Sequence, residues 1–306
     1  MIHIFIINPY AGNQHFTNDL RKKLEQYKEI KYFIFHTRHA GDESELVKRV
    51  LRFFDDEKLR IYCCGGSGTI KNVINGIDNL NKVEIAFFPC GLSNSFICSF
   101  GEKNLEAFYS IEKQIAGSAV PIDYIKTNNG VSLNSMSVGY DQSIIEKVDK
   151  FRNLSILGKR IPYFLGLFHG IMLTRPSSFE VKYDDGEYSG KCAQIIFANG
   201  CSLGGMQLDT RAKVSDGLGS YYICPDLGFW GMNKLFRHLI SKKFNRNSDF
   251  VKIGESSAFT IRRKDSKAFQ IDLDGELQMS CLEWRAEIVH KGLNFVLPEG
   301  VTLDEQ

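Results

Sequence analysis

The sequence has no apolar run approaching the ~20 residues that a transmembrane helix needs, and it starts in a strand-like segment without the features of a signal peptide. Its formal net charge is only +2, which argues against nucleic-acid binding by the whole surface. Its eight cysteines contain no Cys-x-x-Cys pair, and its seven histidines show no ligand spacing. These absences argue against a structural zinc site, and no Ser/His/Asp arrangement of a hydrolase can be defined. We therefore expect a cytoplasmic protein with free thiols.

Strands and helices alternate in the first part of the chain. With 306 residues, of which 43% are hydrophobic, the chain is long enough for about two domains with packed cores. Strand-like runs at 2–7, 32–35, 61–64 and 84–88 are separated by helical patterns at 18–27, 43–54 and 70–80. This alternation predicts a parallel sheet covered on both faces, over residues 1–124. Ligands bind such sheets at the carboxyl ends of the strands.

The pattern changes after about residue 124. Short strand-like segments follow one another with little helix between most of them, at 131–141, 178–188, 192–199, 218–224, 257–263, 268–273 and 283–290. Asp184 to Glu187 carries a hairpin signal. We therefore predict a second domain over 125–292, built mainly as an antiparallel β-sandwich.

A glycine-rich segment, Gly65-Gly66-Ser67-Gly68-Thr69, lies between a strand-like run and a helical pattern. Strand, glycine turn and helix is a geometry in which backbone N–H groups converge on a phosphate. Glycine also permits close approach of the anion and positive φ angles. An ordinary tight turn explains the same residues equally well, and the spacing alone does not separate the two interpretations.

Several motifs together resemble the diacylglycerol kinase catalytic-domain family, which includes bacterial lipid kinases and sphingosine kinases. The matching segments occur in the family's order over nearly the whole chain: Asn8 to Gly12, Thr37 to Asp42, Gly65 to Thr69, Asn75 to Ile77, Pro89 to Phe96, Asn134 to Asp141, Asn199-Gly200, Gly204 to Met206, Ser215 to Leu218 and Asp274 to Glu276. NAD kinases are similar more distantly, but the motifs of the second half fit the lipid kinases better.

The resemblance implies an ATP and Mg²⁺ site and a returning C-terminus. Segment 293–306 is expected to pack against the first domain. The nucleotide site is expected to use Asn8, Thr37, Gly65, Gly66, Ser67, Gly68, Thr69 and Leu92. Bacterial relatives also hold a structural Mg²⁺, whose position corresponds to the side chain of Asp216 and the carbonyls of Lys213 and Leu218.

Asp274 and Glu276 are the candidate catalytic carboxylates, because the glycine between them can turn both toward one cleft. A plain hairpin turn is the alternative explanation from the residues alone. The resemblance favours catalysis and implies that Glu276 accepts the proton of the hydroxyl that is phosphorylated.

The sequence also departs from the family at the expected nucleotide site. Ser67 stands where the family has Asp, Asn72 where it usually has Glu, Leu92 where it has Thr, and Ser95 where it has Asp. Three carboxylates are thus missing, although Mg²⁺ is usually bound through one or two carboxylates together with phosphates and water.

Two functions follow as alternatives. The first is an ATP-dependent lipid kinase that phosphorylates a hydroxyl of a diacylglycerol-like or long-chain lipid at the membrane surface. The second is a kinase-fold module that binds nucleotide or lipid without efficient catalysis. Basic and apolar residues over 143–173 and 234–246 are typical of a peripheral membrane contact, but also of ordinary helices with a solvated face. The oligomeric state is not set by the sequence, and a homodimer is one alternative.

Overall fold

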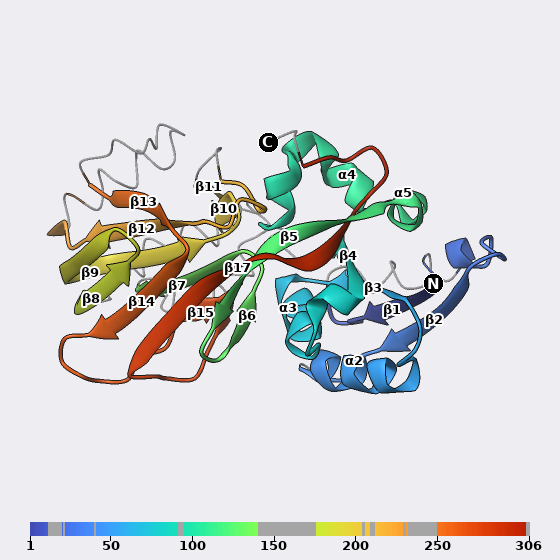
Figure 1. Ribbon diagram of the computed structural model, residues 1–306, viewed down its shortest axis with the longest axis horizontal. Helices are drawn as coiled ribbons and strands as arrows, with labels where there is room; N and C mark the ends of the chain where they lie inside the picture. Colours follow the sequence, from blue (N-terminus) through green and yellow to red (C-terminus); the bar gives the residue numbers. More distant parts are fainter. Residues whose placement is uncertain are drawn as a thin grey trace, which may run out of the picture.

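The chain forms two lobes, which are joined by a pair of long strands (Figure 1). The computed structural model describes residues 1–11, 20, 22–39, 41–90, 95–139, 176–203, 206–208, 212–228, 231 and 250–303. The fold class predicted from the sequence is confirmed: parallel strands make up the N-terminal sheet, and antiparallel strands follow in the C-terminal region.

The N-terminal lobe contains a parallel sheet in the order β4-β3-β1-β2. Its strands are β1 (Ile2–Ile7), β2 (Lys31–His36), β3 (Leu59–Gly65) and β4 (Val83–Pro89). Every residue of β1, β3 and β4 is buried, which explains why these strands read as continuous apolar runs. The carboxyl ends of β1 and β3 lie side by side, because Ile7 is paired with Cys64.

Two main helices accompany this sheet, α2 (Asp42–Phe53) and α3 (Ser67–Asn75). α2 lies within one residue of the helix predicted at 43–54. The helix predicted at 70–80 is shifted, because α3 begins inside the glycine-rich segment and ends at Asn75. Of the helix predicted at 18–27, the described residues 20 and 22–24 are helical, and a turn follows at 25–26. The remaining helical segments are short: α4 (Leu105–Phe108), α5 (Ile111–Ala116) and the 3₁₀ turns η1 (Leu80–Lys82), η2 (Ile97–Phe100) and η3 (Glu102–Asn104).

The C-terminal lobe is built from antiparallel strands around a core that includes the fully buried Trp284. Its strands are β6 (Gly130–Ser132), β7 (Ser135–Gly139), β8 (Ser177–Tyr183), β9 (Gly186–Ala198), β10 (Ser202–Leu203), β11 (Met206–Gln207), β12 (Gly219–Pro225), β13 (Lys252–Ser256), β14 (Ala258–Arg263), β15 (Asp272–Leu273) and β16 (Glu276–Leu277). The hairpin predicted at Asp184 connects β8 and β9, with Tyr183 opposite Gly186.

The lobes are joined by β5 (Ser118–Thr127) and β17 (Glu283–Leu297), which pair antiparallel. β17 also pairs with β14 in the C-terminal lobe and with β4 in the N-terminal lobe. It is longer than the strand predicted at 283–290, and β5 was not predicted as a strand. Phe295, in the segment expected to return to the first domain, is paired with Ile85. The boundary between the two predicted domains stays a prediction.

The β5–β17 pair contains a bulge between Val289 and Leu293, where the register shifts. Lys291 has a positive φ of 50°, and a Cβ on Gly292 would come within 2.6 Å of the Tyr124 ring. A glycine is therefore required there by space. Bulges bend a strand and increase its twist, which allows β17 to belong to the sheets of both lobes.

We expect Phe295→Ala to lower the free energy of unfolding by about 3–5 kcal/mol, the usual range for removing a buried phenyl ring. Phe295 is fully buried, and its ring centroid lies 5.4 Å from those of Phe96 and Phe100. Urea unfolding measures the change. Phe53→Ala is the matched control, since Phe53 is 79% exposed. Equal stability of the two variants would contradict a structural role for the returning strand.

Candidate active site

The glycine-rich segment forms the turn between β3 and α3. Gly65 is the last residue of β3, Gly66 caps α3, and Ser67 is its first residue. Gly66 has a φ of −92°, and the positive-φ glycines do not include any residue of this turn. The positive φ that glycine permits is therefore not used in this turn. Glycine is required by space instead, because the Thr69 side chain fills the position where a Cβ of Gly65 would stand.

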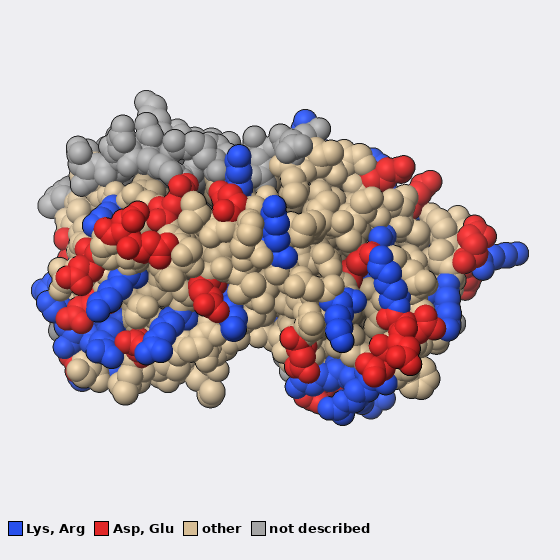
Figure 2. Space-filling view, viewed as in Figure 1, with Lys and Arg blue, Asp and Glu red and all other residues tan. Residues whose placement is uncertain are grey.

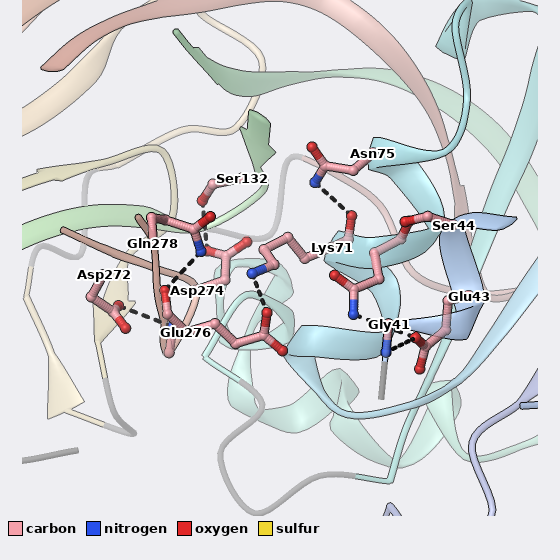
Figure 3. Close-up of polar contacts among 12 residues, drawn as sticks. Gly41, Glu43, Ser44, Lys71, Asn75, Ser132, Asp272, Asp274, Glu276 and Gln278 are labelled. Carbon is pink, nitrogen blue, oxygen red and sulfur yellow. Dashed lines mark hydrogen bonds and ion pairs between the residues drawn. The ribbon is translucent and has the colours of Figure 1, made fainter. Parts of the chain in front are cut away.

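The Asp274 to Glu276 turn meets this segment from the other lobe. A Cβ on Gly68 would collide with Oε1 of Glu276, so the carboxylate lies directly against the first turn of α3. Oε2 of Glu276 accepts a hydrogen bond from Nζ of Lys71 (Figure 3). The Lys71 side chain is 6% exposed and that of Glu276 is 43% exposed. Two residues 205 positions apart in the sequence thus form one ion pair.

Asp274 holds the turn in place. Its Oδ1 accepts hydrogen bonds from Ser132 Oγ at 2.7 Å, from Asn134 N at 3.0 Å and from Ser135 N at 2.9 Å, and its Oδ2 accepts one from Leu133 N at 2.9 Å. Burial raises the pKa of the Asp274 carboxyl, while these four donors oppose the shift. The carboxylate predicted to share catalysis therefore anchors the turn to the 132–135 segment.

The backbone of this turn explains why Glu276 faces the other lobe. Asp274 and Gly275 both have positive φ, 53° and 89°, between the paired residues Leu273 and Glu276. Positive φ at both central residues is the geometry for which Asp-Gly is favoured in two-residue hairpins. The hairpin that was the alternative to catalysis is thus present, and it directs Glu276 toward Gly68.

A second buried carboxylate, that of Glu43, lies behind the glycine-rich turn. Glu43 is 1% exposed. Its Oε1 accepts a hydrogen bond from Asn8 Nδ2 at 3.3 Å, and its Oε2 accepts from Gly41 N at 3.1 Å and Asn72 Nδ2 at 3.4 Å. Asn8 Nδ2 is also 3.2 Å from Thr69 Oγ1. Glu43 therefore connects the end of β1, the start of α2 and the first turns of α3.

The other predicted nucleotide residues are placed as follows. Thr37 follows β2 and is 3% exposed; its N donates to Ile7 O at 3.0 Å, and its Oγ1 has no hydrogen-bond partner among the described residues. Ser95, which stands where the family has Asp and was not itself a predicted nucleotide residue, is buried, and its carbonyl accepts a hydrogen bond from Ser202 Oγ at 3.2 Å. Leu92 lies outside the described residues. The structure thus brings Asn8, Thr69 and the glycines together.

The donor set does not fit a Mg²⁺ ion held by protein carboxylates at the glycine-rich turn. Such an ion needs hard, preferably anionic oxygen ligands. Positions 67 and 72 carry neutral side chains, Glu43 is enclosed by three donors, and Glu276 is paired with Lys71. A metal ion that arrives with a nucleotide would depend on phosphate and water oxygens instead.

The predicted structural Mg²⁺ site lies elsewhere, in the loop before β12. Oδ1 of Asp216 accepts a hydrogen bond from Leu218 N at 3.0 Å, and Lys213 is exposed. Loss of solvent raises the pKa of Asp216, and the negative charges of Asp123 and Glu255 raise it further. Among the described residues no group of three or more His, Cys, Asp and Glu is arranged to hold a metal ion. This cation site stays a prediction.

Asp123 ties the same loop to the bulge of β17. It is fully buried, and its carboxylate accepts hydrogen bonds from Gly217 N at 2.6 Å and Lys291 N at 2.7 Å. His290 Nδ1 lies 3.0 Å from the same carboxylate. The bulge that connects the two lobes is thus held by a buried carboxylate.

Glu43 and Lys71 were missed by the sequence analysis. Acidic residues are common in the first turn of a helix, where the dipole favours them, so Glu43 gives no separate signal. Lys71 stands beside the apolar Ile70, Val73 and Ile74. A lysine within a buried helix segment is the one available signal, because lysine is rarely buried unless it is paired.

Comparisons with known proteins show which family and fold this chain is similar to. The family model of the diacylglycerol kinase catalytic domain matches residues 3–127. The diacylglycerol kinase of Bacillus subtilis (strain 168) is 25% identical over 287 residues, covering 89% of this chain and 88% of that protein. The resemblance to the diacylglycerol kinase catalytic-domain family is thus confirmed.

Solved structures show the same fold over nearly the whole chain. A diacylglycerol kinase from Bacillus anthracis str. Sterne has a TM-score of 0.69 at 19% identity, covering 98% of both chains. A second structure from the same organism has a TM-score of 0.77 at 22% identity, covering 98% of this chain and 96% of the other. Within the described part of this chain, no helix is both long and apolar enough to span a bilayer.

We expect Glu43→Gln to lower the free energy of unfolding by roughly 1–3 kcal/mol, since its new amide group faces two amide donors in a buried site. The double variant Glu43→Gln/Asn72→Glu restores one carboxylate and one amide, and we expect it to recover most of the loss. Chemical denaturation measures both. Glu45→Gln, on the exposed side of the same helix, is the control and should change little. A double variant less stable than Glu43→Gln would refute this interpretation.

We expect Asp274→Asn to lower the free energy of unfolding by roughly 1.5–3 kcal/mol, the usual contribution of a hydrogen bond to a charged group. Asn tolerates the positive φ of this position, so the substitution changes the charge and not the backbone. Thermal unfolding, with Asp265→Asn as the exposed control, reports the effect. Two variants with the same midpoint would show that the buried anchor is not needed.

Proposed function

We propose that this relative of the diacylglycerol kinases transfers the γ-phosphoryl group of ATP to a hydroxyl of a diacylglycerol-like or long-chain lipid. The observation that carries the proposal is the contact of the Glu276 carboxylate with Gly68. It brings a candidate proton acceptor to the turn where backbone N–H groups can bind a phosphate. The relatives named above carry the kinase activity in their names, which supports the reaction class.

The start of α3 is suited to a phosphate. The first turn of α3 contains no acidic residue, and its N-cap makes no side-chain hydrogen bond. The helix dipole and the N–H groups of the first turn therefore favour an anion at this end. Glycines at 65, 66 and 68 place no side chains of their own at that position. The turn would hold the phosphates by its backbone, which does not depend on the charge missing at Ser67.

The chemistry assigned to Glu276 is proton acceptance. The lipid hydroxyl oxygen attacks the γ-phosphorus, the bond from that phosphorus to the bridging oxygen breaks, and ADP leaves. The hydroxyl proton passes to the Glu276 carboxylate, and Asp274 holds the turn that presents it. No step in this sequence uses a protein-held metal ion.

A lipid acceptor is supported by apolar side chains that follow the catalytic turn. Met279 is 73% exposed and Leu282 is 63% exposed, on the segment between β16 and β17. They lie within six residues of Glu276 in the sequence. A cytoplasmic protein in peripheral contact with a membrane can place these side chains against lipid. The segments 143–173 and 234–246 lie outside the described residues.

The surface charge is consistent with a local contact. Figure 2 shows Lys and Arg interspersed with Asp and Glu over the visible face, and a notch in the outline where the two lobes meet. No single sign of charge dominates this face. The proposed contact with a membrane therefore does not depend on a general electrostatic attraction of this face to anionic lipid.

A second function, a binding module without efficient catalysis, is favoured by two features of the site. Positions 67 and 72 are neutral, and Glu276 is already occupied by Lys71. Such a module would bind ATP but would release no phosphorylated lipid. The assay below separates it from the enzyme.

Transfer of label from [γ-³²P]ATP to a mixed lipid extract tests the proposed reaction. We expect a labelled lipid with the wild-type chain, and a decrease of roughly 10²–10⁴-fold in turnover for Glu276→Gln, the usual range for a positioned general base. Glu287→Gln, an exposed acid on β17, is the control and should keep full turnover. ATP binding with no labelled lipid would identify the binding module, and equal turnover of the Glu276 variant would remove Glu276 from the mechanism.

A further inference from the structure

Lys71 is the buried cation of the candidate active site. It belongs to α3, one turn after Ser67, and its side chain is 6% exposed. Its carbonyl accepts a hydrogen bond from Asn75 Nδ2 at 2.8 Å, and Asn75 Oδ1 accepts one from Val131 N at 2.9 Å. These contacts fix the helix at this point against β6. Within the described part of the chain, the ion-pair partner of Lys71 is Glu276.

The ammonium group points toward the amino end of α3. Side chains in a helix lean toward its N-terminus, so a lysine one turn in reaches back over the first turn. The position of its partner agrees: Glu276 places Oε2 on Lys71 and Oε1 against Gly68. Figure 3 shows the Lys71 and Glu276 side chains directed toward each other.

The Glu276 carboxylate thus occupies the position of an anion at a helix N-terminus. It lies against the glycine-rich turn and carries the lysine as its counter-ion. A phosphate group placed there would meet the same two partners, the start of α3 and the Lys71 ammonium. It would also compete with the carboxylate for both, because two anions repel each other over one site.

We propose that Lys71 is a ligand of the transferred phosphate, and that its pair with Glu276 is a latch which nucleotide opens. Phosphate takes over the ammonium, and the released carboxylate becomes available to the lipid hydroxyl. This inference rests on the proposed function of the same site. It also assigns the positive charge at the phosphate to a lysine, where positions 67 and 72 provide no carboxylate for a metal ion.

The latch orders the reaction. In the unliganded chain Glu276 is held by Lys71, so its carboxylate is not directed at a lipid hydroxyl. Nucleotide therefore binds before the lipid is deprotonated. The Lys71 ammonium is also a preorganised cation at the site where negative charge develops, and it stabilises the transition state. It does so without a protein-held Mg²⁺ ion, which the residues of this site do not fit.

Calorimetric titration with ATP and with tripolyphosphate, both in EDTA, tests the inference on the full chain. We expect Lys71→Met to bind each probe at least about 10-fold more weakly than the wild type. Lys71→Arg should stay within a few-fold, because a guanidinium also binds phosphate. Glu276→Gln should bind tripolyphosphate several-fold more tightly, since the competing anion is gone. Lys48→Met, on the exposed face of α2, is the control, and circular dichroism checks each fold.

The outcomes are distinct. If neither probe binds the wild-type chain in EDTA, the inference fails, while the transfer of label to lipid still decides the proposed function. If the wild type binds and Lys71→Met binds equally well, Lys71 is not a phosphate ligand. If Lys71→Met binds the probes more weakly but Glu276→Gln binds tripolyphosphate no more tightly than the wild type, Glu276 does not compete with phosphate for Lys71, and the proposed latch is wrong. If the ion pair were merely structural, Lys71→Met and Glu276→Gln would not change phosphate binding in opposite directions.

Discussion

The pairing of β17 with strands of both lobes is the constraint on which the candidate site depends. β17 is paired with β14 before its bulge, with β4 after it, and with β5 on both sides of it. The two lobes therefore cannot move independently without breaking backbone hydrogen bonds. Asp123 holds the bulge by accepting hydrogen bonds from Gly217 and Lys291. Because this strand fixes the lobes, a turn in one can present a side chain to a helix in the other.

The two carboxylates of the Asp274 to Glu276 turn have different roles. Asp274 is buried and surrounded by four donors, and it keeps the turn rigid. Glu276 remains 43% exposed and faces the glycine-rich turn. On the opposite side, Glu43 is enclosed behind the turn and holds Asn8 and Asn72. The carboxylate that can meet a substrate is therefore also the one whose partner is a cation.

Much of the fold could be predicted from sequence, because the patterns are local. Buried parallel strands read as apolar runs, and the Asp184 hairpin has its own turn residues. β5 was missed because its mixed burial, with exposed Ser118 and Pro121, gives neither alternation nor an apolar run. The part of β17 after residue 290 was expected only through the family resemblance. The bulge of β17 requires Gly292, because a Cβ there would collide with the Tyr124 ring of another strand.

The site could be predicted only in part, for the same physical reason. Asp-Gly in positive φ is a local signal and marks the turn before Glu276. The partner of Glu276 is not a local property, since Lys71 is 205 residues away and reads as one polar residue on a helix. The reason for glycine at these positions is not local either: a Cβ on Gly65 would meet the Thr69 side chain, and a Cβ on Gly68 would meet the Glu276 carboxylate, which only the folded chain brings close.

The central claim is that the glycine-rich turn and the Asp274 to Glu276 turn form one electrostatic unit across the two lobes. A double-mutant cycle of Lys71→Met and Glu276→Gln, followed by urea unfolding without ligand, tests it most directly. Side chains in direct contact are expected to be coupled, and we predict a coupling free energy above about 0.5 kcal/mol, allowing for the partial exposure of Glu276. Additive effects within about 0.3 kcal/mol would contradict the account, because independent sites add in this way.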